Sequence, residues 1–244
     1  MTLKSTTRVF LILLLLTGLA TACKKQVSVL VITGGHEFDT TEFFEAFRSL
    51  DGIVFDSVTQ PGAMKLLASD RVLDYDVLAF YDFVPDMEPA DSTVFLNLTN
   101  KGQPMLFLHH SLCTFQRWDG YMKMVGGRYH MPEFGADSLL WSGYKHDIEL
   151  NVKVTDSRHP VTQGIEEFTI LDEGYSNISY MPGITPLLET DHPFCSPVNG
   201  WVNSYDESTI VYLMLGHDKH AFSNEAFQLL LANSIHWLST NHSQ

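Results

Sequence analysis

Runs of apolar residues alternate along the chain with segments whose apolar residues recur at helical spacing. Nearly continuous apolar runs are typical of parallel strands buried on both faces; they cover residues 26–33, 76–81, 104–108 and 209–215. Shorter or half-apolar runs predict strands over residues 53–58, 148–154, 184–189 and 201–205. Helical spacing predicts helices over residues 39–50, 61–68 and 88–100, and from residue 223 or 224 onward. Asp39 and Glu42 form a capping box at the start of the first helix.

Strands and helices alternate through the first half of the chain. This succession predicts an α/β fold with an open parallel sheet and right-handed crossovers. Between Ser111 and Gly143 no clear period is present, and a long irregular stretch in a compact domain is usually a functional loop region. No repeat or linker interrupts the pattern, so residues 23–244 are expected to form a single domain.

The N-terminal segment has the pattern of a targeting sequence. Lys4 and Arg8 precede an apolar run of about 14 residues, Val9–Ala22, whereas a membrane-spanning helix needs roughly 20. Residues 1–22 therefore predict a signal peptide. The ending Leu19-Ala20-Thr21-Ala22-Cys23 resembles a bacterial lipobox, although Leu19 lies one position further back than usual. We expect Cys23 to be lipidated and the protein to be anchored in the bacterial cell envelope; the alternative is secretion with cleavage elsewhere.

Charge and composition narrow the range of partners. The chain has 244 residues, 45% of them hydrophobic, which is ordinary for a packed globular protein. It carries 15 Lys and Arg against 29 Asp and Glu, and loss of residues 1–22 would leave a formal net charge of −16. Such an acidic chain is a poor partner for nucleic acid. Cys113 and Cys195 are expected to be two buried free thiols, with a disulfide as the alternative.

Histidines follow three of the predicted strands. His36 comes after the first strand, His109 and His110 after the strand 104–108, and His217, followed by Asp218, after the strand 209–215. In open α/β sheets, ligands bind beyond the carboxyl ends of the strands, so these side chains are expected on one rim. Imidazole groups bind metals and exchange protons near neutral pH, and this rim is therefore the predicted site.

Further candidates depend on weaker context. Glu173 and Tyr175 fall near the expected end of a strand, and Glu173 would serve as a general base or metal ligand. Arg128 follows two glycines and would bind a carboxylate or a sugar hydroxyl, with a surface ion pair as the alternative. Gly34 and Gly35 would present backbone N–H groups to an anion before the first helix. No role is assigned to His146, His192, His220, His236 or His242. The sequence lacks a Walker loop, a G-x-G-x-x-G turn after the first strand and a G-x-S-x-G elbow.

Seven short segments, in order, resemble the trehalose-utilisation (ThuA-like) family of the class I glutamine amidotransferase-like superfamily. They are Ile32–His36, Tyr75–Leu78, Leu108–Ser111, Gly126–Tyr129, His159–Thr162, Asp172–Tyr175 and Leu215–Asp218. The resemblance implies a flavodoxin-like open, mostly parallel sheet with helices on both faces. It also implies a role in sugar metabolism, often beside oxidoreductases that make keto-sugars.

The sequence departs from these relatives at two places. Amidotransferase relatives carry a nucleophilic cysteine after the strand that corresponds to residues 104–108, where this chain has His109-His110-Ser111 and only later Cys113. We therefore do not expect cysteine-dependent glutamine hydrolysis. Relatives often have a basic segment where this chain has Asp206-Glu207-Ser208, so a basic ligand contact there is not expected.

The leading hypothesis is an envelope-anchored enzyme that acts on a glycoside or its keto form. The catalytic group would be His36, His109, His110 and His217, with Glu173 as acid or base. Substrate hydroxyls would meet the side chains or backbone of Gly35, Arg128, Tyr175 and Asp218.

Two questions stay open at this stage. Several neutral imidazoles and a carboxylate suit a divalent metal such as zinc, with His36, His110 and His217 as candidate ligands; no other cofactor is expected. The alternative function is a non-catalytic sugar-binding lipoprotein that uses Trp118, Tyr121, Trp141 and Trp201 as platforms. The expected partners are a small carbohydrate and, through the lipid anchor alone, a membrane; the sequence predicts no particular sugar or oligomeric state.

Overall fold

A computed structural model describes residues 26–86 and 88–241, so the predicted signal peptide and Cys23 lie outside the described residues. The strands are β1 (Val27–Gly34), β2 (Ile53–Thr59), β3 (Val77–Asp82), β4 (Met105–Leu108), β5 (Gly127–Arg128), β6 (Gly143–Val154), β7 (Phe168–Ser176), β8 (Ser179–Tyr180), β9 (Thr185–Thr190), β10 (Val198–Tyr205) and β11 (Ser208–Leu213). The α-helices are α1 (Thr40–Arg48), α2 (Ala63–Leu67), α3 (Pro89–Asn100), α4 (Asp119–Val125), α5 (Lys219–Phe222) and α6 (Glu225–Thr240). None of these described helices is long and apolar enough to cross a membrane.

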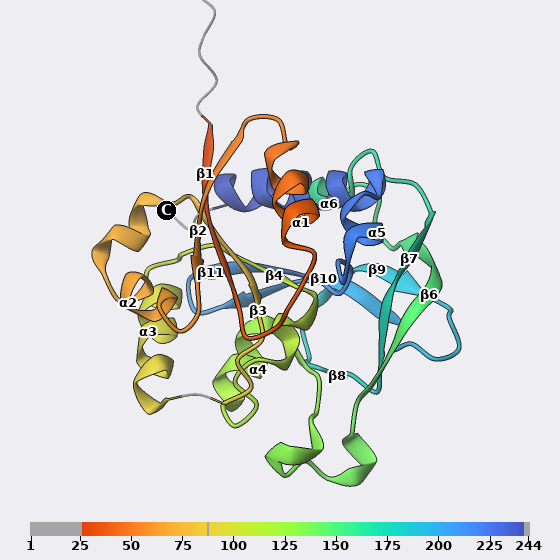
Figure 1. Cartoon of the computed structure of the whole chain (residues 1–244), viewed down its shortest axis with the longest axis horizontal. Coiled ribbons are helices and arrows are strands. Elements are labelled where there is room, and N and C mark those ends of the chain that lie inside the picture. The colour runs from red at the N-terminus through yellow and green to blue at the C-terminus, as the bar shows by residue number, and fades with distance from the viewer. Residues whose placement is uncertain (1–25, 87, 242–244) are drawn as a thin grey trace, which may run out of the picture.

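The main sheet has nine strands in the order β2-β1-β3-β4-β11-β10-β9-β6-β7 (Figure 1). The first five are parallel to one another, in the order known from flavodoxin-like sheets. The last four extend this half with antiparallel pairs. The α/β flavodoxin-like prediction is confirmed, and the fold carries an antiparallel half beside its parallel one.

Alternate side chains of each buried strand enter one of two cores on the two faces of the sheet. In β1, Val29 and Val31 belong to one core and Leu30 and Ile32 to the other. Helices α1 and α6 cover the first core, and α3 and α4 cover the second. Burial on both faces explains why these strands are continuously apolar in sequence.

The helix starts differ in part from the prediction. The capping box at Asp39 is wrong, because its side chain makes no cap hydrogen bond and instead accepts from the Lys219 backbone N–H at 3.0 Å. A capping box is present at α3, between Glu88 and Asp91. Asn224 caps α6 as predicted, since its side chain accepts from two N–H groups of the first turn. The stretch predicted to be irregular, residues 111–143, contains helix α4.

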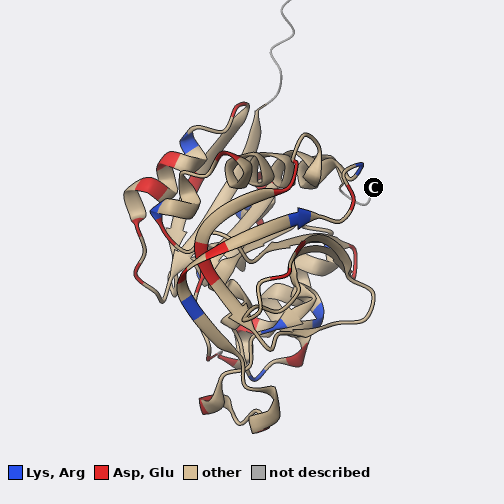
Figure 2. Cartoon of the chain, turned by 90° about the vertical axis from the view of Figure 1, so that its right-hand side faces the viewer, with Lys and Arg blue, Asp and Glu red and all other residues tan. Residues whose placement is uncertain are grey.

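Charged side chains are spread over several elements (Figure 2). Basic side chains pair with neighbouring acids, as in the ion pairs Lys101–Asp70, Arg128–Asp119 and Lys153–Asp191. Exposed pairs of this kind contribute only about 0–1 kcal/mol each. The fold is therefore stabilised chiefly by its two apolar cores.

Candidate functional site

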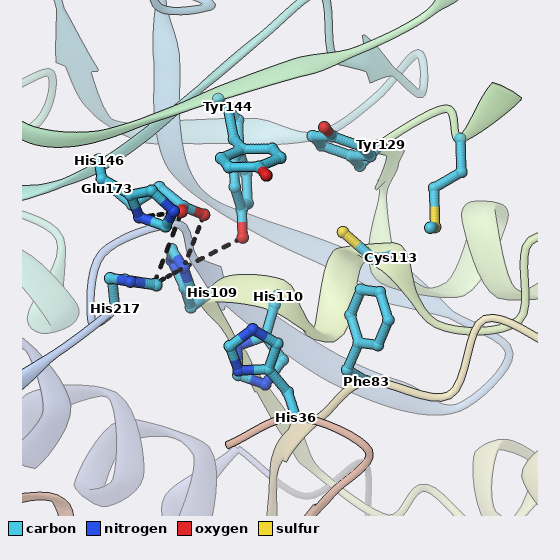
Figure 3. A pocket seen from close by; sticks show the side chains of 12 residues that line it. His36, Phe83, His109, His110, Cys113, Tyr129, Tyr144, His146, Glu173 and His217 are labelled. Atoms are coloured by element: carbon cyan, nitrogen blue, oxygen red, sulfur yellow. Dashed lines mark hydrogen bonds and ion pairs between the residues drawn. The ribbon is translucent and has the colours of Figure 1, made fainter. Parts of the chain in front are cut away.

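The histidines predicted at the strand ends lie around one cavity at the carboxyl edge of the parallel strands. This cavity has a volume of about 230 Å³, and His36, His109, His110 and His217 all line it (Figure 3). The ring centroids of His36 and His110 lie 5.0 Å apart, and those of His109 and His217 lie 5.2 Å apart. Topology thus brings together residues that are up to 181 positions apart in sequence.

His109 holds a strained position directly after β4. Its φ is +47°, in the left-handed region that few residues other than glycine adopt, and its side chain is fully buried. Its Nδ1 lies 2.6 Å from the Met214 carbonyl, and because a carbonyl can only accept, Nδ1 carries a hydrogen. The other nitrogen, Nε2, therefore faces the cavity.

Three polar groups surround Nε2 of His109. His217 Nδ1 is 3.2 Å away, the Glu173 carboxylate 3.3 Å away and the Tyr175 hydroxyl 3.1 Å away. Two of them, Glu173 and Tyr175, come from β7, the last strand of the sheet. The antiparallel half therefore curls back over the carboxyl edge of the parallel half.

Glu173 does not lie at a strand end, as the sequence suggested, but within β7. Only 7% of its side chain is exposed. Burial raises its pKa, but the hydrogen bond and charge of His109, with the nearby His217 and His146, outweigh this and lower the pKa below its usual value. Glu173 is therefore ionised at neutral pH.

The histidines differ in their electrostatic environments. Burial lowers the pKa of His109, but Glu173, Asp172 and the Met214 carbonyl more than reverse this effect and raise it. Burial, aided by repulsion from neighbouring histidines, lowers the pKa of both His110 and His217. His110 is therefore neutral at physiological pH, whereas His109 forms a charge-assisted contact with Glu173.

Asp172 fixes the loop that carries His217. Its buried carboxylate accepts hydrogen bonds from the backbone N–H groups of Gly216 at 2.8 Å, His217 at 2.9 Å and Glu173 at 2.8 Å. Burial raises its pKa, while His109 and these three N–H groups oppose that rise. Asp172 thus positions His217 without lining the cavity itself.

His146, which had no predicted role, belongs to the site. Its Nδ1 lies 2.7 Å from the Glu173 carboxylate, and about half of its side chain is exposed. The pairing of β6 with β7 shifts register between Lys145 and Ile148, and Asp147 has a φ of +52°. Such bulges turn side chains toward active sites. A register shift leaves no sequence motif. The one hint of it in the sequence is Asp147, because Asp adopts a positive φ more readily than most residues.

Aromatic side chains form much of the cavity wall. These are Phe83, Tyr129, Tyr144 and Tyr175. The predicted platforms are wrong for Tyr121 and Trp201, because both are buried in the second core. Trp118 packs against Phe95, and the half-exposed Trp141 lies outside the cavity lining.

Two of the residues expected to bind substrate make structural contacts instead. The Arg128 guanidinium donates hydrogen bonds to the Asp119 carboxylate and to the Trp118 carbonyl, and it does not line the cavity. Arg128 thus forms the ion pair that the sequence left as the alternative. The Asp218 side chain caps α5 by accepting a hydrogen bond from the backbone N–H of His220.

The other two lie at the cavity or beside it. Gly35 lies next to His36 with a φ of +81°, and any Cβ there would clash with the Phe83 carbonyl. Tyr175 lines the cavity through its contact with His109.

Cys113 lines the cavity but is poorly suited to nucleophilic catalysis. Its side chain is buried, and this burial raises the pKa of the thiol far above its usual value. The reactive thiolate is therefore suppressed. Cys113 and Cys195 are both free thiols, as expected, but only Cys113 is buried; Cys195 is half-buried.

Comparison with known proteins agrees with this geometry. A model of the family ThuA, described as trehalose utilisation, matches residues 28–238. The chain belongs to the ThuA family. The predicted family is thus confirmed.

Solved structures show the same fold. A ThuA-like protein from Parabacteroides merdae is 18% identical, with 90% of this chain and 92% of that chain covered and a TM-score of 0.74. A ThuA-like protein from Bacteroides uniformis is also 18% identical, with 91% of this chain and 95% of that chain covered and a TM-score of 0.70. A β-galactosidase from Rahnella sp. R3 is 12% identical, with 85% of this chain but 31% of that chain covered and a TM-score of 0.56. Among curated proteins, none matches the sequence.

Proposed function

We propose that this ThuA protein is an enzyme of carbohydrate metabolism that acts on a glycoside or keto-glycoside in the histidine-lined cavity. Membership of a trehalose-utilisation family supports the carbohydrate class. The observation that carries the proposal is the convergence of His109, Glu173, His217 and His146 at one end of a cavity with aromatic walls. Perturbed pKa values at clustered groups in a cleft are typical of active sites.

The size and walls of the cavity suit one sugar ring. Its volume of about 230 Å³ is below the roughly 300–1,000 Å³ that pockets for whole drug-sized ligands occupy. A single ring would fit, with the rest of the substrate outside. Phe83 and Tyr144 offer apolar faces to the C–H groups of a sugar, and Tyr144 is 59% exposed at the mouth.

The polar end of the cavity can move protons. Glu173 is an ionised carboxylate held between His109 and His146, which makes it the candidate general base. His146 is half-exposed and can exchange protons with solvent. Neutral His110 has a buried Nε2 with no partner among the described residues, and this nitrogen is available to a substrate hydroxyl. In the proposed reaction, Glu173 accepts a proton from the substrate or from water.

The proposal includes anchoring in the bacterial cell envelope. Its support is the apolar segment Val9–Ala22 followed by the lipobox-like Leu19–Cys23. Labelling of cells with a radioactive fatty acid tests it: the wild-type chain should carry the label and Cys23→Ser should not. Equal labelling of both chains would contradict lipidation at Cys23.

Turnover assays test the enzymatic proposal. The purified protein is incubated with trehalose, other glucosides and their keto forms, and the released sugar is measured. The variant His109→Ala/His110→Ala/His217→Ala should be inactive, whereas His220→Ala, an exposed histidine after β11, should retain full activity. Full activity of the triple variant would refute the assigned site.

Two other results would redirect the assignment. Sugar binding without turnover of any tested glycoside would favour a recognition protein. Loss of activity in Cys113→Ser alone would favour a thiol mechanism.

A further inference from the structure

We propose that His109, Glu173 and His217 bind one divalent transition-metal ion, with zinc as the first probe. The catalytic use of this ion rests on the proposed function, but its binding does not. Among the described residues, these three form a group whose candidate ligand atoms all lie within 4.8 Å of one another. Of the ligands expected from the sequence, Glu173 and His217 belong to this group; His36 and His110 do not.

The separations within this group match a metal site. His109 Nε2 lies 3.2 Å from His217 Nδ1 and 3.3 Å from Glu173 Oε1, and His217 Nδ1 lies 3.7 Å from Glu173 Oε2. Zinc bonds to nitrogen and oxygen are about 2.0–2.2 Å long, so tetrahedral geometry places neighbouring ligands about 3.3–3.5 Å apart. The two histidines contact different oxygens of Glu173, so one carboxylate oxygen would share a single ion with the two imidazole nitrogens once the carboxylate turns; the three ligand atoms already lie within 4.8 Å of one another.

Hydrogen bonding alone does not satisfy this cluster. Because the Met214 carbonyl occupies the Nδ1 hydrogen of His109, Nε2 offers a single lone pair or a single N–H. Three polar groups nevertheless lie within 3.3 Å of it: His217, Glu173 and Tyr175. A shared cation would let His109, His217 and Glu173 each direct a lone pair to the same point.

The surrounding contacts are those that support metal ligands. Histidine ligands usually donate their second N–H to a carbonyl or carboxylate, which fixes the ring, and His109 donates to Met214 at 2.6 Å. His146 holds the second carboxylate oxygen of Glu173 at 2.7 Å. Asp172 fastens the backbone of His217. Each of the three ligands thus has its own positioning contact.

Two imidazoles and one carboxylate leave a coordination position free. Catalytic zinc sites keep three protein ligands and an open fourth position, and the same ligand set also binds iron. Here the free position would face the cavity in which we place the sugar. A metal bound there would polarise a sugar oxygen or activate a water molecule. His36, whose ring centroid lies 6.4 Å from that of His217, borders the cavity without joining the cluster.

Calorimetric titration with zinc chloride tests the site. The full chain, solubilised in detergent and stripped with a chelator, should bind one ion in this site. His217→Ala and Glu173→Gln should weaken binding by more than roughly 100-fold, and His146→Ala by roughly 10- to 100-fold. His36→Ala and His220→Ala are matched controls that should stay within about 3-fold of the wild-type affinity.

Folding and coordination are checked separately. His217 is partly exposed, so circular dichroism should show that His217→Ala retains its fold. In the wild-type protein, cobalt(II) should give the absorption bands of a four- or five-coordinate ion, and His217→Ala should lose them.

Specific outcomes would overturn the proposal. These are no zinc binding by the wild-type chain, unchanged binding in both His217→Ala and Glu173→Gln, or a loss in His36→Ala instead. Turnover of glycosides by a chain that binds no metal would refute the metal site and leave the enzymatic proposal standing. One bound zinc ion without turnover of any glycoside would refute the enzymatic proposal and leave the metal site standing.

Discussion

The two halves of the sheet contribute to the site in different ways. The parallel half supplies His36, His109 and His217 from the loops that follow β1, β4 and β11. The antiparallel half supplies Glu173 and His146 from within β7 and β6. Parallel strands present their carboxyl ends at one edge as a consequence of topology, whereas an antiparallel strand reaches that edge only when the sheet curls.

This difference separates two tasks. Strands β1, β3, β4 and β11 of the parallel half are nearly continuously buried, so they fix the positions of the histidines that follow them rigidly. The antiparallel half brings the carboxylates over the edge, where Asp172 and Glu173 bond to residues that follow β11 and β4. The site therefore forms only when both halves are in place. The predictions below test this division of tasks.

The largest effect is expected from the antiparallel half, at Glu173. Replacement by Gln removes the charge that contacts His109 and His146, and with it the general base of the proposed function or, when the proposed ion is bound, one of its ligands. Loss of general acid–base catalysis alone lowers turnover roughly 10²–10⁴-fold. Steady-state assays of Glu173→Gln should show a fall in kcat of at least that size. Glu149→Gln, an exposed position in β6, is the control and should keep wild-type activity; an equal loss in both would contradict the assignment.

Asp172 should give the next largest effect, because it joins the two halves. Asn in its place keeps one acceptor oxygen but loses the charge that binds the Gly216 and His217 N–H groups. Hydrogen bonds to charged groups contribute about 1.5–3 kcal/mol each, so the free energy of unfolding should fall by that order. As His217 loses its anchor, kcat should fall roughly 10- to 100-fold. Urea unfolding and turnover measure both quantities.

The control for Asp172 is Asp191→Asn. Asp191 forms an exposed ion pair with Lys153, and solvent screens such pairs so that they contribute little to stability. Unchanged turnover in Asp172→Asn would show that His217 holds its place without this link between the halves.

The parallel half could be predicted from sequence to a large extent. Strands β1, β3, β4 and β11 are nearly continuously apolar because both faces are buried, and His36, His109, His110 and His217 follow three of them in sequence. The antiparallel contributions are different in kind. The sequence predicts Glu173 near the end of a strand, whereas it lies within β7.

Other site residues depend on contacts that no sequence pattern encodes. His146 enters the cavity through a register shift, which side-chain periodicity does not record. Tyr121 and Trp201 are aromatic residues of the type that stacks against a sugar ring, but packing against the sheet buries them. Arg128 is held by Asp119, nine residues earlier and itself in α4. In each case a long-range or loop contact decides the role.

A smaller effect is expected at the bulge itself. Asp147 has a φ of +52°, and a β-branched residue there costs about 1–2 kcal/mol, which favours a regular strand. Asp147→Val should therefore turn His146 away from Glu173 and lower kcat about 10-fold. Asp147→Gly retains the left-handed conformation and should stay near wild-type activity. Equal kcat values for these two variants would contradict a role of the bulge in aiming His146.

The smallest effect on turnover is expected at Asp82, which ends β3 in the parallel half but does not line the cavity. Its side chain accepts from Gln60 through Oδ2, while Oδ1 has no partner among the described residues. Burial raises its pKa from 3.8 to about 7. Asp82→Asn should keep kcat within about 2-fold of the wild-type value. A polar residue at the end of a parallel strand belongs to the site only where the curled antiparallel half meets it, and Asp82 does not line the cavity.

The stability of the wild-type chain, compared with that of this variant, should nevertheless depend on pH in a defined direction. Because the pKa of Asp82 is higher in the folded than in the unfolded state, ionisation destabilises the fold. The effect is absent below about pH 4, grows as pH rises, and is complete above about pH 7, where it amounts to a few kcal/mol. Relative to Asp82→Asn, the wild-type chain should therefore lose stability between pH 4 and 7. Parallel urea curves at pH 5 and 8 measure this; an unchanged difference between the two chains would contradict the raised pKa.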